Sequence, residues 1–143
     1  MECISLPLTV YKTQENMFRI GIIGAGWIAR KMAVAIAPSK EMEIYAISSR
    51  SITKAEAFAR EFGIPAAYGS YEEMTRDPEV DLVYIATPPS HHFEHAMLAL
   101  ENGKPVLVEK AFTANADQAS RLIDEARKRT RTYDNIIKTM IRK

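Results

Sequence analysis

The segment GIIGAGWIA, residues 21–29, contains the pattern Gly24-x-Gly26-x-x-Ala29. Small residues at this spacing are typical of the turn that binds a dinucleotide. Gly24 permits a tight turn, Gly26 lets the backbone approach a pyrophosphate, and Ala29 keeps the following helix close to the strand. A helix that begins near Trp27 directs its free N–H groups and the positive end of its dipole towards the phosphates.

The flanking sequence supplies the context that this turn requires. Residues 18–23 (FRIGII) form a short apolar run with β-branched residues, which predicts a buried strand. Residues 27–37 predict a helix that Pro38 ends, and its apolar face is formed by Ile28, Met32, Ala35 and Ile36. This context favours a dinucleotide turn over the alternative, an ordinary strand-to-helix turn.

Strand and helix patterns continue to alternate along the chain. Further strands are predicted at 43–49, 66–70, 81–87 and 105–110, and further helices at 52–63, 71–77, 91–102 and 115–128. The expected N-caps are Ser51, Ser90 and Asn115, and the expected helix stops are Gly63 and Asn102–Gly103. Parallel strands joined by right-handed helical crossovers satisfy this order. The sequence therefore predicts an α/β fold, a Rossmann-type doubly wound parallel sheet in a single domain.

Composition excludes several classes of protein. The 143 residues correspond to one domain, and a net charge of +1 gives no general attraction to nucleic acid or to anionic membranes. The single cysteine, Cys3, cannot form an internal disulfide, which favours a reducing compartment. No run approaches the roughly 20 apolar residues of a membrane-spanning helix, and the opening segment lacks the features of a secretory signal. We expect a cytoplasmic protein.

Three segments are expected along the chain. Residues 1–17 show no usable period and predict a flexible lead, and residues 18–129 carry the alternating pattern of the folded domain. Residues 130–143 form a basic tail in which a short helix is expected, with Ile136, Ile137, Met140 and Ile141 on one face.

The end of the second predicted strand bears on the choice between two nicotinamide cofactors. An acidic residue at this position binds the ribose 2′-hydroxyl of NAD, whereas an arginine accepts the 2′-phosphate of NADP. The chain reads Ser48-Ser49-Arg50-Ser51, with no carboxylate. Hydroxyls and a guanidinium suit a phosphate, so we expect NADP to be preferred over NAD. The alternative is that Arg50 is a solvated surface side chain.

A longer segment, ATPPSHHFEHAMLALENGKPVLVEKAFTANADQA at 86–119, extends the argument. Together with GIIGAGWIA it resembles the Gfo/Idh/MocA oxidoreductase family, and within it the dihydrodiol dehydrogenase-like branch. The resemblance covers residues 18–128. It implies a Rossmann domain followed by a C-terminal α+β domain, and transfer of hydride between a nicotinamide cofactor and a sugar, polyol or diol-like hydroxy compound.

The resemblance also implies roles for particular residues. Lys110 matches the lysine of the family's Glu-Lys-Pro motif, at the cofactor–substrate junction, and is the expected catalytic residue; Ala111 replaces the proline. An amine there can carry the proton that a hydroxyl loses as hydride departs. Without the resemblance, a surface lysine would be favoured. Combined with the glycine turn, the expected cofactor-binding residues are Gly24, Gly26, Trp27, Ile28, Ala29, Ser49, Arg50, Thr87, Pro88, His92, Glu109 and Lys110.

Three neighbouring histidines raise the question of a metal site. His91 and His95 share a helical face, as zinc ligands often do. Further cysteines, histidines or a well-spaced carboxylate do not accompany them in the sequence pattern. We therefore expect no metal, and a polar face at the start of a helix.

The resemblance ends near Arg129. The family continues into a sixth apolar strand, but the sequence here continues as the basic tail. We therefore expect a truncated chain that lacks the C-terminal domain and is inactive alone. A small-molecule substrate is expected to bind only to a full-length form. The truncated chain is expected to self-associate through exposed sheet surface. One alternative is a non-catalytic NAD(P)-binding module or an inactive remnant. Another is a Rossmann domain that binds a CoA or methyl-donor ligand; this alternative agrees with the glycines but does not explain Glu109–Lys110.

Overall fold

The computed structural model describes residues 17–129, so most of the predicted lead and all of the predicted tail lie outside the described residues. Five parallel strands form one sheet in the order β3-β2-β1-β4-β5. The strands are β1 (Phe18–Ile23), β2 (Met42–Ser48), β3 (Ala66–Tyr68), β4 (Leu82–Ile85) and β5 (Val106–Val108). The chain proceeds from β1 outward to β3, then returns to place β4 on the other side of β1. The predicted doubly wound α/β fold is confirmed.

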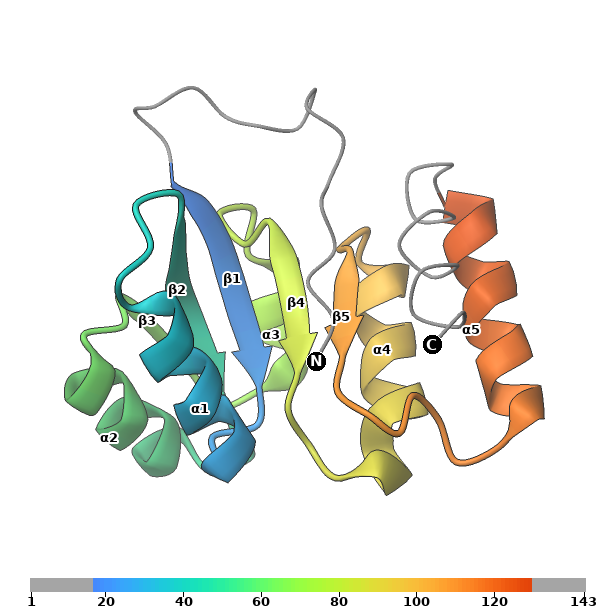
Figure 1. Ribbon diagram of the computed structural model, residues 1–143, viewed down its shortest axis with the longest axis horizontal. Coiled ribbons are helices and arrows are strands. Elements are labelled where there is room, and N and C mark those ends of the chain that lie inside the picture. The colour runs from blue at the N-terminus through green and yellow to red at the C-terminus, as the bar shows by residue number, and fades with distance from the viewer. Residues whose placement is uncertain (1–16, 130–143) are drawn as a thin grey trace.

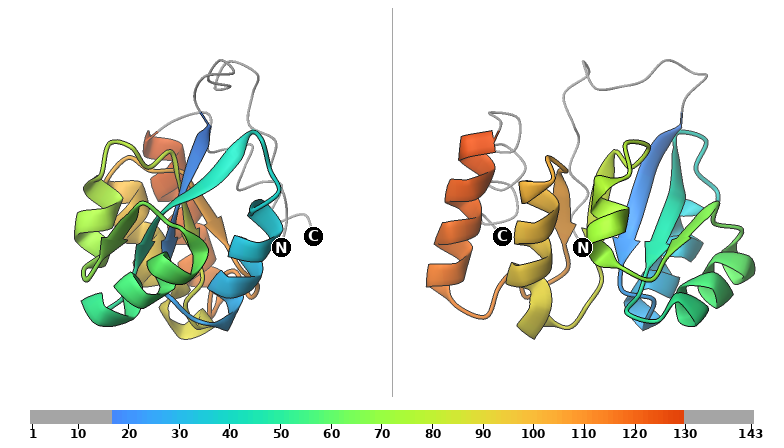
Figure 2. Two further views of the ribbon diagram at one scale, coloured as in Figure 1. Left: turned by 90° about the vertical axis from the view of Figure 1, so that its left-hand side faces the viewer. Right: turned by 180° about the vertical axis from the view of Figure 1, so that it is seen from behind.

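Five α-helices connect and cover these strands. They are α1 (Trp27–Ile36), α2 (Ile52–Phe62), α3 (Tyr71–Arg76), α4 (His92–Glu101) and α5 (Ala116–Arg129). The ribbon views show α1 and α2 on one face of the sheet and α3, α4 and α5 on the other (Figures 1 and 2). Within the described range, no helix is both long and apolar enough to cross a membrane.

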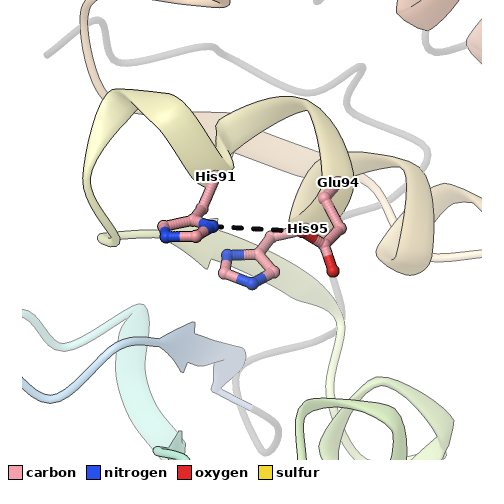
Figure 3. A group of neighbouring side chains, drawn as sticks. All are labelled: His91, Glu94 and His95. Carbon is pink, nitrogen blue, oxygen red and sulfur yellow. Dashed lines mark ion pairs between the residues drawn. The ribbon is translucent and has the colours of Figure 1, made fainter.

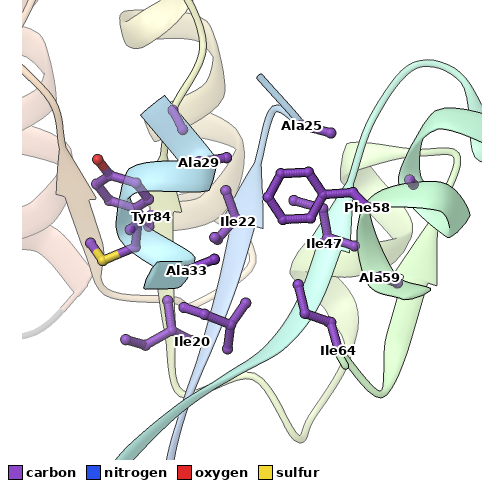
Figure 4. Close-up of a cluster of buried hydrophobic side chains, with 14 residues drawn as sticks. Ile20, Ile22, Ala25, Ala29, Ala33, Ile47, Phe58, Ala59, Ile64 and Tyr84 are labelled. Carbon is purple, nitrogen blue, oxygen red and sulfur yellow. The ribbon is translucent and has the colours of Figure 1, made fainter. Parts of the chain in front are cut away.

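The face under α1 and α2 illustrates how strand period produces a layered core. Ile20 and Ile22 of β1 point to this face, where Ala29 and Ala33 bring α1 close and Phe58 of α2 packs alongside (Figure 4). A strand buried on both faces reads as a continuous apolar run, as β1 does. Small residues at positions i and i+4 of α1 therefore set the distance between helix and sheet.

The opposite face carries a second cluster. Ile23, Val83 and Ile85 contribute from the strands, while Leu100 of α4 and Leu122 of α5 pack onto them. The register between β1 and β2 shifts after Ile20, which pairs with Ile44, because Gly21 pairs with Ala46. This bulge lets Ile44 face one cluster and Ala46 the other, so a strand that departs from strict alternation still fills both layers.

Helix ends match the predicted signals with one exception. Ser51 accepts a hydrogen bond from the Lys54 N–H at 3.3 Å, and Gly63 ends α2 in the left-handed conformation. Asn115 accepts from the Gln118 N–H at 2.9 Å. The prediction that Ser90 caps the following helix is wrong: Pro89–His91 form a 3₁₀ turn, and α4 begins only at His92. The two preceding prolines favour this tighter start, which takes Ser90 into the turn.

The buried face of α1 also differs from the predicted apolar face. Ala35 is exposed, whereas the buried residues of α1 are Ala29, Met32 and Ala33. The predicted apolar face was rotated relative to the face that is buried. Alanine contributes little to the hydrophobic pattern of a helix, so the pattern did not distinguish Ala29 and Ala33 from Ala35. Close approach to the sheet selects the small side chains Ala29 and Ala33.

Candidate functional site

The carboxyl edge of the sheet, at the bottom of Figure 1, contains a cavity of about 820 Å³. The segments after β1 and β4 both line it, through Gly24–Gly26 and Ala86–Pro88. The chain leaves β1 towards one side of the sheet and β4 towards the other, so the two connections diverge at this point. Ligands of open α/β sheets bind in the crevice that such a divergence creates.

The two glycines of the β1–α1 turn have different surroundings. Gly24 has a φ of 100°, and a Cβ placed on it would lie 3.0 Å from Thr87 Cγ2 and 3.1 Å from the Ala86 carbonyl oxygen. Among residues 17–129, no atom lies within 4 Å of a Cβ placed on Gly26. Gly24 is therefore required by the fold, whereas Gly26 leaves open space beside the backbone at the cavity wall.

The N-terminus of α1 is open to a ligand. Gly26 is its N-cap, its first turn has no acidic residue, and no side chain in the described part of the chain caps it. By contrast Ser51, Ser70 and Asn115 cap α2, α3 and α5. Backbone N–H groups without intrahelical partners and the positive end of the helix dipole favour an anion here.

The end of β2 brings two cationic side chains to the same cavity. The Ser48 hydroxyl is buried and donates to the Ile22 carbonyl oxygen at 2.9 Å, while Ser49 Oγ accepts from the Ser51 N–H at 3.3 Å. These bonds fix the turn that carries Arg50 into the cavity lining, where Lys54 joins it from the first turn of α2. Lys54 was not predicted as a site residue. Its position four residues after Arg50, at the start of a predicted helix, was the sequence signal that could have indicated it.

His92 lies beneath the cavity, not in its lining. Its side chain is fully buried, with Nε2 2.7 Å from the Thr87 carbonyl oxygen and Nδ1 2.6 Å from the Ala111 carbonyl oxygen. It therefore connects the loop after β4 to the loop after β5. The sequence predicted that His92 contacts a cofactor. In the structure its contacts hold the loops after β4 and β5 relative to each other.

Glu109 and Lys110 lie at the end of β5, at the same edge of the sheet. The hydroxyl of the buried Tyr84 donates to Glu109 Oε1, and burial followed by this carboxylate raises the pKa of Tyr84 well above its usual value. Tyr84 therefore remains a neutral donor that holds Glu109. Lys110 is exposed, the Lys110–Ala111 peptide is cis, and Lys110 lies outside the cavity lining.

The structure thus divides the predicted site residues into two groups. Six of them line the cavity together: Gly24, Gly26, Ser49, Arg50, Thr87 and Pro88. The other six do not line it: Trp27, Ile28, Ala29, His92, Glu109 and Lys110. Trp27 is exposed, with the Lys31 ammonium 5.1 Å from its ring centre, and Ala29 is buried against the sheet.

The cavity lining also contains groups that sequence reasoning did not assign. His95 is buried, its Nδ1 lies 2.8 Å from Thr87 Oγ1, and the Tyr71 ring packs edge-on against it with 4.7 Å between ring centres. Burial lowers the pKa of His95. The expectation that no well-spaced carboxylate accompanies the histidines is wrong, because one helical turn brings Glu94 beside His91 and His95 (Figure 3).

Comparison with known proteins adds to this geometry. Residues 18–135 match the model of the Gfo/Idh/MocA group, described as an oxidoreductase family with an NAD-binding Rossmann fold. The chain is 41% identical over 111 residues to mouse trans-1,2-dihydrobenzene-1,2-diol dehydrogenase, covering 76% of this chain and 33% of that protein. It is 44% identical over 119 residues to D-xylose 1-dehydrogenase (NADP(+)) of Hypocrea jecorina, covering 75% and 30%.

The chain is also similar to a solved structure. A 3-ketoreductase from Actinomadura kijaniata, in complex with NADP and TDP-benzene, superimposes with a TM-score of 0.75 at 36% identity, covering 80% of this chain and 35% of that one. The chain spans about a third of the length of the curated relatives it matches.

Proposed function

This chain belongs to the Gfo/Idh/MocA oxidoreductase family, as an NAD(P)-binding Rossmann domain, and from that premise we propose that its cavity binds NADP in preference to NAD. We further propose that the domain serves hydride exchange with a sugar-, polyol- or diol-like hydroxyl compound. The observation that carries the cofactor proposal is that an uncapped helix N-terminus lines one cavity together with the cationic side chains of Arg50 and Lys54.

The cavity fits a dinucleotide pyrophosphate at the β1–α1 turn. Open space beside Gly26 allows the phosphates to approach the backbone, and the N–H groups of the first turn of α1 donate to them. In this arrangement Ala29 contributes through the close packing of α1 on the sheet and does not touch the ligand.

A 2′-phosphate suits the part of the cavity that the β2–α2 segment lines. Arg50 and Lys54 belong to that lining, and no carboxylate in the Ser48–Ser51 turn is available for a ribose 2′-hydroxyl. A guanidinium binds phosphate through two parallel hydrogen bonds, and the ammonium adds a second charge. The NADP named with the xylose dehydrogenase and with the ketoreductase structure supports this assignment.

Lys110 is the residue that we assign to the reacting end. Bound nicotinamide would supply hydride transfer, and the chain must then hold or move the proton of the substrate hydroxyl. An amine at the end of β5, beside the loop that His92 ties to Thr87, can take that role. The diol and sugar dehydrogenases among the relatives support a hydroxyl substrate of that class.

The experiment is a titration of the chain with NADPH and with NADH, followed by the fluorescence of the reduced nicotinamide. We expect tighter binding of NADPH. Arg50→Ala should weaken NADPH binding by roughly 10- to 100-fold, because a hydrogen bond to a charged group contributes about 1.5–3 kcal/mol, and should leave NADH binding nearly unchanged.

Arg60→Ala is the matched control, because Arg60 is an exposed arginine on α2 that does not line the cavity. Equal affinity of the wild-type chain for NADPH and NADH, or equal losses from Arg50→Ala and Arg60→Ala, would contradict the preference for NADP. Absence of binding to both nucleotides would contradict the assignment of the cavity.

A further inference from the structure

Three potential metal ligands gather at the start of α4. His91, Glu94 and His95 each offer a ligand atom, and these atoms all lie within 4.8 Å of one another. His91 Nδ1 is 3.9 Å from Glu94 Oε2, and the rings of His91 and His95 stack with 5.6 Å between their centres. Figure 3 shows the three side chains projecting to the same side of the helix.

His95 is held in place by its surroundings. It is the buried member of the group, with Nδ1 2.8 Å from Thr87 Oγ1 and the Tyr71 ring against its face. When the Nδ1–H donates to the Thr87 hydroxyl, Nε2 keeps its lone pair. Metal-binding histidines are fixed in this manner, with the second ring nitrogen donating to a neighbouring oxygen.

The other two members can adjust to an ion. His91 and Glu94 are exposed, so their side chains can rotate to bring all three ligand atoms to one centre. The positive end of the α4 dipole disfavours a cation here, and the Glu94 carboxylate offsets this cost. Two imidazoles and one carboxylate suit Zn²⁺ and similar transition-metal ions, whereas Mg²⁺ and Ca²⁺ prefer oxygen ligands alone.

We propose that His91, Glu94 and His95 form a binding site for a divalent ion of the Zn²⁺ class, with water completing the coordination. Three protein ligands and a water match the open type of zinc site. The site goes beyond the dinucleotide function and does not rest on it, because its ligands are His91 of the 3₁₀ turn and Glu94 and His95 of α4, and no phosphate is required.

The test is a titration of the full chain with Zn²⁺ alone, in the absence of nucleotide, using competition with a chelating dye. Cys3 is replaced by serine in every sample so that its thiol cannot contribute. We expect one Zn²⁺ per chain, and at least tenfold weaker binding in His91→Gln and in Glu94→Gln, since even loss of an outer partner weakens metal sites by about 10- to 100-fold. Both substitutions are at exposed positions, so the fold is retained.

Glu101→Gln is the matched control, because Glu101 is an exposed carboxylate of the same helix that also lines the cavity. It should bind Zn²⁺ as the parent chain does. Electron paramagnetic resonance with Cu²⁺ gives a second readout, in which two nitrogen ligands in the parent should fall to one in His91→Gln. Unchanged Zn²⁺ affinity in both test variants, equal weakening in Glu101→Gln, or a Cu²⁺ signal without nitrogen coupling would overturn the proposal.

Discussion

At the residue scale, His92 has the most consequential contacts of the candidate site. Its two ring nitrogens reach the carbonyl oxygens of Thr87 and Ala111, so one side chain joins the loops after β4 and β5. The first loop lines the cavity and the second follows Lys110. The relative position of the cavity wall and Lys110 therefore depends on an imidazole that lies outside the cavity lining.

We expect His92→Ala to lower the free energy of unfolding by about 2–4 kcal/mol. The substitution removes one contact from each of the two carbonyl oxygens and leaves a cavity in place of the buried ring. Urea unfolding followed by circular dichroism measures this loss. His91→Ala, at the exposed neighbouring histidine, should stay within about 0.5 kcal/mol of wild type. A His92→Ala chain that unfolds at the wild-type urea concentration would show that the loops are held without the imidazole.

At the scale of elements, the β1–α1 turn separates the demands of folding from those of binding. Gly24 adopts a left-handed φ and faces Thr87 and Ala86 closely, whereas Gly26 has an ordinary backbone conformation and open space beside it. One turn thus contains a glycine that the fold needs and a glycine that we assign to ligand binding. The three-residue fingerprint alone does not distinguish these roles.

Alanine at these two positions should therefore give opposite results. Gly26→Ala should leave the free energy of unfolding within about 0.5 kcal/mol of wild type, and should weaken NADPH binding at least tenfold because the methyl group enters the space next to the phosphates. Gly24→Ala should lower stability by about 1 kcal/mol or more, because its φ and its contacts strain any side chain. Thermal unfolding and nucleotide titration on both variants provide the comparison. Tight NADPH binding by Gly26→Ala would count against the proposed position of the pyrophosphate.

At the scale of the whole molecule, the domain is a sheet covered by helices on both faces, and the cavity at its carboxyl edge is lined by several titratable groups. His95 is the buried histidine there whose pKa is lowered, chiefly by burial. The groups that act on it are Glu94, which raises its pKa, and His91, His92 and Arg50, which lower it further. Tyr71 packs against the ring. Such a group links the stability of the entire fold to pH.

We expect the free energy of unfolding to fall as pH drops from about 7 to about 5. As the pH falls through this interval, the unfolded chain protonates His95 near its ordinary value of 6.5, before the folded chain does, so the unfolded state binds more protons. The contribution of His95 is present above the unfolded pKa and is lost as pH falls towards the folded pKa. Glu61 and Glu72, whose pKa values are lowered from 4.5, act only at lower pH.

Urea unfolding at several pH values measures this slope. His95→Gln should flatten it between about pH 7 and 5, and His91→Gln, which replaces the exposed partner, should retain most of it. A slope that is the same in the wild type and in His95→Gln would assign the acid sensitivity to another group.

The sequence by itself determined the fold, because the information is local. Apolar runs such as FRIGII, the periodic helices, the caps Ser51 and Asn115 and the stop Gly63 each act within a few residues, and the structure confirms them. The glycine turn and Arg50 were also found this way, since a strand end and the following turn are adjacent in the chain. The start of α4 was predicted wrongly because the local sequence is compatible with two structures. Two prolines followed by a 3₁₀ turn can precede a helix as readily as a serine cap can.

Only the tertiary structure decided how distant segments share the site. The lining of one cavity by Lys54, Tyr71 and His95, together with Arg50 and Gly26, depends on how three crossovers place their helices over the sheet. The burial of His92 against two separate loops is likewise a matter of packing, because hydrogen bonds to carbonyl oxygens leave no mark in a sequence pattern. Contacts between elements arise when the helices close on the sheet, and side-chain spacing along the chain does not encode their geometry.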